Sequence, residues 1–201
     1  MMIQIGRPFS PIFGATFINE RHEEVEGSFR DLCNGEGITY TQISEDIRIL
    51  ENFPILKKIL LNKFYEFIKT SNLNYNNKFG ITTSWLTKSE NRQQTMIHNH
   101  KNSLYSGVYY YGNKYYSNSG DLVFINPLTE ISTIDIEPEG STSNFETVFP
   151  KPKLLIFFPS YIKHKFRSNF SNTPRYSLAF NIVPIGQYGV SDSSYDTSWF
   201  N

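Results

Sequence analysis

The spacing of apolar residues changes abruptly after residue 71, and this change limits what the chain can fold into. Apolar residues recur at helical spacing from Ile55 to Ile68, which predicts an amphipathic helix over residues 53–70. Asn52 is expected to cap the helix, and Pro54 lies in its first turn, where a missing N–H costs nothing. From Phe79 onward the segments are short, β-branched and aromatic, and turn residues separate them. The sequence therefore predicts a mainly β chain with one or more supporting N-terminal helices.

Eight short strands are predicted after the helix, and their spacing favours a jelly roll, the double-stranded β-helix. The predicted strands are Gly80–Thr87, Gln94–His98, Leu104–Tyr111, Asp121–Ile125, Ser132–Ile136, Lys153–Phe158, His164–Arg167 and Arg175–Val183. The 201 residues have the length of one domain. We expect a single domain over 1–185, with 1–71 as N-terminal support and 79–183 as the core, followed by a polar, loosely held tail over 186–201.

The composition excludes several classes of protein. Lys+Arg and Asp+Glu each number 19, so the net charge is zero and gives no general attraction to nucleic acid or anionic membrane. The single cysteine, Cys33, excludes an intramolecular disulfide and a cysteine-cluster zinc site. There is no apolar run of transmembrane length, and the first ten residues lack the features of a signal peptide. We therefore expect a cytoplasmic protein without a membrane partner.

Three of the four histidines suit a metal site. His98 and His100 are two residues apart, and on a strand such residues point to the same face. His164 follows the apolar strand Leu154–Phe158 and a Pro-Ser turn, at the start of the next predicted strand. Three imidazoles arranged in this way could bind a metal on one face and leave other positions open.

A candidate anion receptor follows eleven residues after His164. Arg175 and Ser177 share a strand face, so that a guanidinium and a hydroxyl point to one spot, as a carboxylate receptor requires. The strand that Arg175 begins is otherwise apolar over Leu178–Val183, so its charge should need a partner. No acidic residue is near in sequence, which leaves a bound anion or a salt bridge to a distant glutamate.

The order of these motifs resembles the Fe(II)- and 2-oxoglutarate-dependent oxygenases, whose fold is a double-stranded β-helix. The resemblance is strongest to a small family of 2OG-Fe(II) oxygenases and covers roughly residues 79–183. Four segments carry it: HNHKNSLYSGVYY from His98, GDLVFINP from Gly120, FPSYIKH ending at His164, and RYSLAFN from Arg175.

The resemblance also implies roles for individual residues. His98 and His164 match the iron ligands of the family. Arg175 matches the residue that pairs with the distal carboxylate of 2-oxoglutarate, with Ser177 beside it, and Tyr110 matches a tyrosine that hydrogen-bonds the same group. His100 departs from the pattern because the common motif has a carboxylate there, so the implied metal site is His98, His100 and His164. Asp121 is the nearest alternative carboxylate ligand.

The resemblance implies a dioxygenase with Fe(II) as cofactor and 2-oxoglutarate as cosubstrate. It would hydroxylate a C–H bond of an unidentified small molecule or protein side chain, for example a prolyl residue. One alternative is a cupin-like metal protein without 2-oxoglutarate, although the glutamate that cupins carry shortly after H-x-H is absent here. Another is a non-enzymatic jelly-roll binding or structural module. The neutral charge argues against a long nucleic acid as partner, and exposed aromatic strands favour a homodimer.

Overall fold

A computed structural model describes residues 40–71, 76–111, 118–127 and 145–198, and the backbone of three further strands at 3–5, 13–17 and 29–31. The described part of the chain contains one long helix, α1 (Pro54–Thr70), preceded by a 3₁₀ helix at Ile49–Asn52. Its strands are β1 (Ile3–Ile5), β2 (Phe13–Phe17), β3 (Phe29–Asp31), β4 (Gln42–Ser44), β5 (Lys78–Ser89), β6 (Tyr105–Tyr109), β7 (Leu122–Ile125), β8 (Phe145–Val148), β9 (Leu154–Pro159), β10 (His164–Phe166), β11 (Arg175–Ile185), β12 (Gln187–Tyr188) and β13 (Tyr195–Asp196).

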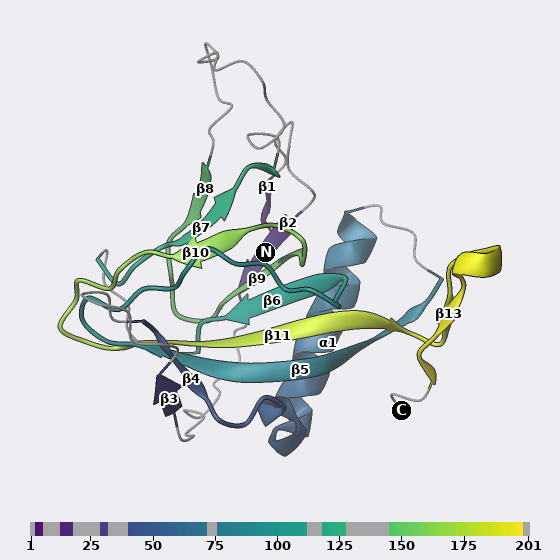
Figure 1. The fold of residues 1–201 in the computed structure, drawn as a ribbon, viewed down its shortest axis with the longest axis horizontal. Coiled ribbons are helices and arrows are strands. Elements are labelled where there is room, and N and C mark those ends of the chain that lie inside the picture. Colours follow the sequence, from purple (N-terminus) through teal and green to yellow (C-terminus); the bar gives the residue numbers. More distant parts are fainter. Residues whose placement is uncertain are drawn as a thin grey trace, which may run out of the picture.

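Two antiparallel sheets face each other, and the helix lies on the outer side of the larger one (Figure 1). The large sheet has the order β1-β2-β9-β6-β11-β5-β4-β3, and the small sheet has the order β10-β7-β8. Apolar side chains of both sheets, among them Val108, Phe124 and Phe158, form the core between them. This arrangement confirms the predicted mainly β fold with a supporting helix. No helix in the described part of the chain is long and apolar enough to cross a membrane.

Strand β11 pairs with both β5 and β6 and presents different residues to its two sides. Leu178, Phe180 and Ile182 face outward and join the core beneath α1. The alternate residues Arg175, Ser177, Ala179 and Asn181 share the inner face of the sheet. One strand therefore contributes to the packing of the helix on one side and to the space between the sheets on the other.

The outer core has an aromatic centre that fixes α1 to the sheet. Phe64 of α1 is fully buried, and its ring centroid lies 5.2 Å from that of Phe79, 5.3 Å from Tyr105 and 5.4 Å from Phe157. Such edge-to-face contacts add to the apolar burial that holds a helix on a sheet. Gly107 of β6 lies directly against the Phe180 ring, and a Cβ at this position would overlap it.

The helix begins differently from the sequence prediction. Its N-cap residue is Phe53 and has no side-chain cap hydrogen bond, so the expected cap at Asn52 is wrong. Asn52 ends the preceding 3₁₀ helix instead, and its side-chain amide donates to Asp46 Oδ2 at 3.1 Å. Pro54 occupies the first turn as expected. Asn52 is part of the 3₁₀ helix before α1 and so cannot cap α1. The spacing of apolar residues does not reveal this 3₁₀ helix.

Six of the eight predicted strands coincide with β5, β6, β7, β9, β10 and β11. Gln94–His98 is not a strand: its backbone makes only isolated bridges, Gln94 to Tyr40 and His98 to His164. The prediction for Ser132–Ile136 lies outside the described residues. The C-terminal segment is not loosely held throughout, because β12 and β13 form a hairpin. Buried Thr197 donates from Oγ1 to the Pro184 carbonyl at 2.7 Å and anchors this hairpin to the end of β11.

Candidate metal centre

The backbone brings the three predicted histidines together from two distant parts of the sequence. The His98 N–H donates to the His164 carbonyl at 3.0 Å, and the His164 N–H donates to the His98 carbonyl at 2.9 Å. The His100 N–H donates to the Ser160 carbonyl at 3.0 Å. The H-N-H segment thus lies along the first residue of β10 and the turn after β9, although it is not itself a strand.

The three imidazole rings converge. Ring centroids lie 4.4 Å apart for His98 and His164, 5.0 Å for His100 and His164, and 5.4 Å for His98 and His100. One nitrogen from each ring lies within 4.8 Å of the others, and among the described residues this is the one group of three or more potential metal ligands. Imidazole nitrogens suit iron, zinc, copper and nickel, so the set can hold a divalent transition metal.

Two backbone carbonyls determine which nitrogens of His98 and His164 face each other. His98 Nδ1 lies 2.8 Å from the Met96 carbonyl, and His164 Nδ1 lies 3.0 Å from the Ile162 carbonyl. A carbonyl oxygen only accepts, so each Nδ1 carries the hydrogen. Each Nε2 then keeps its lone pair, which is the form that coordinates a metal.

His100 is oriented by side chains instead. Its Nδ1 lies 2.8 Å from Asn181 Oδ1 and 2.8 Å from Ser106 Oγ. Burial lowers the pKa of His100 to about 4, although the hydrogen bond to Asn181 opposes this change. Burial, and then the neighbouring His98 and His100, also lower the pKa of His164. Both rings are therefore neutral at neutral pH and ready to act as ligands without losing a proton.

A cavity of about 220 Å³ adjoins the histidines on the inner face of the large sheet. Trp85 and Thr87 of β5, Val108 of β6 and Ala179 of β11 form one wall. The remaining lining residues are Tyr40, Thr41, Ile43, Gln94, Thr95, Met96, Ile97 and Phe166, besides the three histidines. Among the described lining residues there is no Asp, Glu, Lys or Arg, so this part of the lining is apolar apart from the imidazole nitrogens and a few neutral polar groups.

Arg175 does not line the cavity itself but lies against one of its lining residues. Its side chain is fully buried, with the guanidinium carbon 4.3 Å from the centroid of Phe166, a lining residue. Nη1 donates to the carbonyls of Ser119 at 2.8 Å and Gly120 at 2.7 Å. The segment just before β7 therefore holds the guanidinium, which no short-range sequence pattern indicates.

Asp121 belongs to the surroundings of Arg175 and is not part of the histidine group. Its Oδ2 lies 3.6 Å from Nη1 of Arg167. Burial raises the pKa of Asp121, and the charges of Arg167 and Arg175 partly offset this effect. Asp121 thus gives Arg175 a nearby negative charge, where the sequence suggested a bound anion or a distant glutamate.

Ser177 and Tyr110 also lie outside the lining of the cavity and contact residues that form it. Ser177 Oγ lies 2.5 Å from Oγ1 of Thr87, a lining residue. Tyr110 is fully buried in the core between the sheets, edge-on to Phe166 at 6.4 Å between centroids. The three histidines therefore line the cavity directly, whereas Arg175, Ser177 and Tyr110 contact its lining residues Phe166 and Thr87 from behind.

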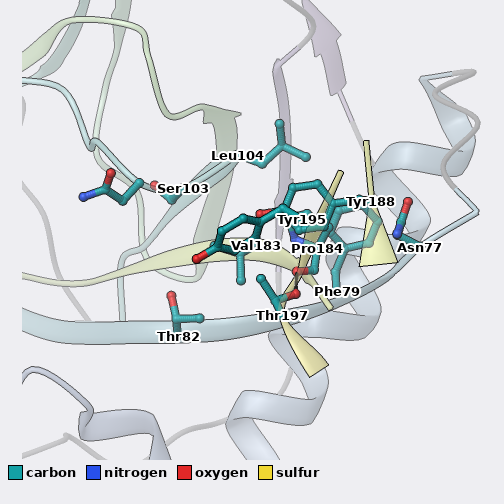
Figure 2. A pocket seen from close by; sticks show the side chains of 11 residues that line it. Asn77, Phe79, Thr82, Ser103, Leu104, Val183, Pro184, Tyr188, Tyr195 and Thr197 are labelled. Carbon is teal, nitrogen blue, oxygen red and sulfur yellow. Dashed lines mark hydrogen bonds between the residues drawn. The ribbon is translucent and has the colours of Figure 1, made fainter. Parts of the chain in front are cut away.

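A second, larger cavity of about 610 Å³ lies at the opposite end of β11, next to the C-terminal hairpin. Tyr188 and Tyr195 form part of its wall near Asn77 and Phe79, and Thr82 and Ser103 lie toward its other side (Figure 2). It contains none of the histidines. Neither this cavity nor the contacts of His100 with Asn181 and Ser106 could be predicted from the sequence.

Two facing antiparallel sheets around three converging histidines define a jelly-roll protein with a candidate three-histidine metal centre. Residues 83–181 match the family described as "Putative 2OG-Fe(II) oxygenase", and this range contains every candidate site residue named above. Over this range the chain is similar to the superfamily of 2OG-Fe(II) oxygenases. No curated protein matches its sequence at a significant level.

Solved structures of such enzymes share the fold at low sequence identity. The non-heme alpha ketoglutarate dependent carbocyclase SnoK from nogalamycin biosynthesis has a TM-score of 0.57 and 13% identity, over 82% of this chain and 73% of SnoK. A 2OG-Fe(II) oxygenase family oxidoreductase from Burkholderia pseudomallei has a TM-score of 0.52 and 13% identity, over 74% and 70%. HygX from Streptomyces hygroscopicus, with nickel, 2-oxoglutarate and hygromycin B bound, has a TM-score of 0.51 and 11% identity, over 75% and 72%.

Proposed function

We propose that the protein is an Fe(II)- and 2-oxoglutarate-dependent dioxygenase that hydroxylates a C–H bond of its substrate. The observation that carries this proposal is the convergence of three imidazoles on one small, largely apolar cavity, with a buried arginine against the lining residue Phe166. The donor set fits the metal, because imidazole nitrogen is a common ligand of iron and each Nε2 has its lone pair available. His98, His100 and His164 would hold the iron.

The three-histidine set has no negative charge of its own. A bound divalent cation would therefore attract a dianion strongly, which supports 2-oxoglutarate as the co-ligand. With iron, 2-oxoglutarate and O2 bound, the site supplies oxidation of a C–H bond to an alcohol, with one oxygen atom in the product and the other in the succinate released with CO2.

The residues of the chain would contribute binding and orientation. Arg175 would pair with the distal carboxylate of 2-oxoglutarate, and its anchoring to the carbonyls of Ser119 and Gly120 fixes the plane of the guanidinium in advance. Ser177 and Tyr110 would donate hydrogen bonds to the same carboxylate. The inner part of the lining, which includes buried Val108 and Phe166, would limit the access of water and so strengthen electrostatic contacts there.

The lining of the cavity also indicates which kind of substrate group it can hold. Because no charged side chain of the described lining could balance a charged group, an uncharged and largely apolar group is what the cavity accommodates best. An aliphatic amino-acid side chain in a protein, with proline as the first choice, meets this requirement, as does part of a neutral small molecule.

The domain limits, the cytoplasmic location and the homodimer stay predictions.

A cupin-like metal protein without 2-oxoglutarate is the second candidate. It is favoured by one observation, the absence of a carboxylate among the three ligands. It gives no role to Arg175, Ser177 or Tyr110, so the two candidates differ in whether 2-oxoglutarate binds.

Succinate formation tests the proposal directly. The protein is purified without oxygen, loaded with Fe(II) and given 2-oxoglutarate and O2 without added substrate. Slow succinate release that is lost in His164→Ala and reduced in Arg175→Lys supports the dioxygenase. Iron binding without either succinate formation or calorimetric binding of 2-oxoglutarate would contradict it and support the cupin-like candidate. A protein that binds no metal would support a binding or structural module.

A further inference from the structure

We propose that Asn181 is a positioning residue that keeps His100 in the one tautomer able to bind the metal. This inference rests on the proposed function, since it assigns Asn181 a part in the same site. Asn181 lies in a motif that the family resemblance covers, but neither the resemblance nor the mechanism above gives it a role.

Three neighbouring strands place the side chains that surround Asn181. In the register of the large sheet, Asn181 of β11 lies opposite Ser106 of β6 on one side and Thr83 of β5 on the other. The amide of Asn181 therefore lies between two hydroxyl-bearing residues on the inner face of the sheet. The His100 ring contacts the amide there, with its Nδ1 2.8 Å from Asn181 Oδ1.

Hydrogen bonds on both sides fix which end of the amide faces His100. Asn181 Nδ2 donates to Thr83 Oγ1 at 2.9 Å, so the nitrogen end is held toward β5. Ser106 Oγ donates to Asn181 Oδ1 at 2.9 Å from the side of β6. Because Oδ1 can only accept, the hydrogen between it and His100 must belong to His100 Nδ1. Nε2 of His100 is then the unprotonated nitrogen.

A series of hydroxyl groups supports this arrangement. Ser103 Oγ donates to Ser160 Oγ at 2.9 Å, and Ser160 Oγ lies 2.8 Å from Ser106 Oγ. Since Ser106 donates its own hydrogen to Asn181, Ser160 must be the donor to Ser106. Each hydroxyl in the series therefore donates toward Asn181 Oδ1. If the amide of Asn181 were rotated so that Nδ2 replaced Oδ1, the Ser106 hydroxyl would lose its acceptor.

His100 differs in this respect from the other two ligands. His98 and His164 are held by backbone carbonyls, which no substitution removes. His100 is held by an amide side chain, assisted by the Ser106 hydroxyl. Partners of this kind orient metal-ligating histidines and raise their basicity, and their loss typically costs about 10–100-fold in metal affinity. Asn181 is therefore the position at which a single substitution should change the metal centre without removing a ligand.

The tautomer of His100 can be observed in the metal-free protein by long-range ¹⁵N–¹H NMR. We expect the wild type to show Nδ1–H only. Asn181→Asp should keep this tautomer, because a carboxylate also accepts. Asn181→Leu, which has a similar size and no acceptor, should populate the Nε2–H form as well. Thr83→Val should have a smaller effect in the same direction, because it releases the amide and leaves its oxygen in place.

Co²⁺ affinity, followed by visible absorption, provides the second measurement. We expect about 10–100-fold weaker binding for Asn181→Leu and near wild-type binding for Asn181→Asp. Asn77→Leu makes the same chemical change beside the second cavity and should leave the affinity unchanged. Thermal unfolding of each variant confirms that it is folded.

The outcomes separate this inference from the proposed function. If Asn181→Leu keeps the wild-type tautomer and binds Co²⁺ as tightly as the wild type, Asn181 has no positioning role. If the tautomer and the affinity change as expected while the wild type neither binds nor converts 2-oxoglutarate, the role of Asn181 stands and the dioxygenase function fails.

Discussion

His98 and His164 exchange both backbone hydrogen bonds of an antiparallel bridge, with N···O distances of 3.0 and 2.9 Å. Their relative placement therefore depends on the main chain and not on the imidazoles themselves. A metal is not needed to bring the two together, because the bridge holds them in place beforehand.

The first prediction concerns His98→Ala. The side chain is exposed and the bridge uses only the backbone, so the free energy of unfolding of the metal-free protein should change by no more than about 0.5 kcal/mol. Affinity for Co²⁺ should fall by about 100-fold or more, since a ligand and not merely its partner is removed. Urea unfolding and a Co²⁺ titration measure the two effects. Retained Co²⁺ binding would show that His98 is not a ligand.

The second prediction concerns Arg175→Lys. A lysine keeps the positive charge and loses the planar fork that pairs with both oxygens of a carboxylate, so KM for 2-oxoglutarate should rise at least about tenfold. Co²⁺ affinity should stay as in the wild type. Arg167→Lys is a matched control, because Arg167 is half exposed and its guanidinium faces Asp121, whereas Arg175 is fully buried against Phe166. An unchanged KM in Arg175→Lys would remove this residue from the cosubstrate site.

The third prediction concerns the outer core. Gly107→Ala should lower the free energy of unfolding by about 1–3 kcal/mol, because the added methyl group overlaps the Phe180 ring. Urea denaturation gives this value. The double variant Gly107→Ala with Phe180→Leu should lose less free energy of unfolding than the sum of the losses in the two single variants, because the smaller leucine leaves room for the added methyl group. Simple additivity of the two changes would show that Gly107 and Phe180 do not compete for space.

The fourth prediction is a pH dependence. The pKa of Asp121 lies above its usual value of 3.8, mainly because of burial, so this carboxyl favours folding when it is protonated. That contribution is present below the unfolded-state pKa and is lost as the pH rises through the folded-state pKa.

Asp121→Asn cannot ionise, so its stability relative to the wild type should increase from about pH 3 to pH 6. Thermal unfolding across this range tests it, with the exposed Asp192→Asn as control. A relative stability that falls with rising pH would mean that the attraction of Arg167 and Arg175 outweighs the effect of burial.

Much of the architecture could be predicted because it rests on short-range periodicity. The helix over 54–70 and six strands follow from spacings of 3.6 and 2 residues. The N-cap prediction was wrong because a 3₁₀ turn precedes the helix, and neighbouring residues alone do not specify that turn. Gln94–His98 has strand-like composition, but only isolated bridges form there.

Only part of the candidate site could likewise be predicted from the sequence. The three histidines could be proposed from their types and order, and the structure brings them together. The surroundings could not be proposed, because they depend on contacts between distant segments. Asn181 lies 81 residues from His100, and the carbonyl of Ser119 lies 56 residues before Arg175. No sequence period connects positions so far apart.

The alternation along β11 separates two kinds of selective constraint within a single strand. Substitutions at Leu178, Phe180 and Ile182 act on the attachment of the helix, whereas Ser177, Ala179 and Asn181 act on the cavity and its histidines. The outward positions can therefore drift among apolar residues of similar volume while the chemistry is preserved. A one-residue insertion in β11 would exchange the two sets at once and abolish both, so this strand should tolerate substitution far better than any change of length.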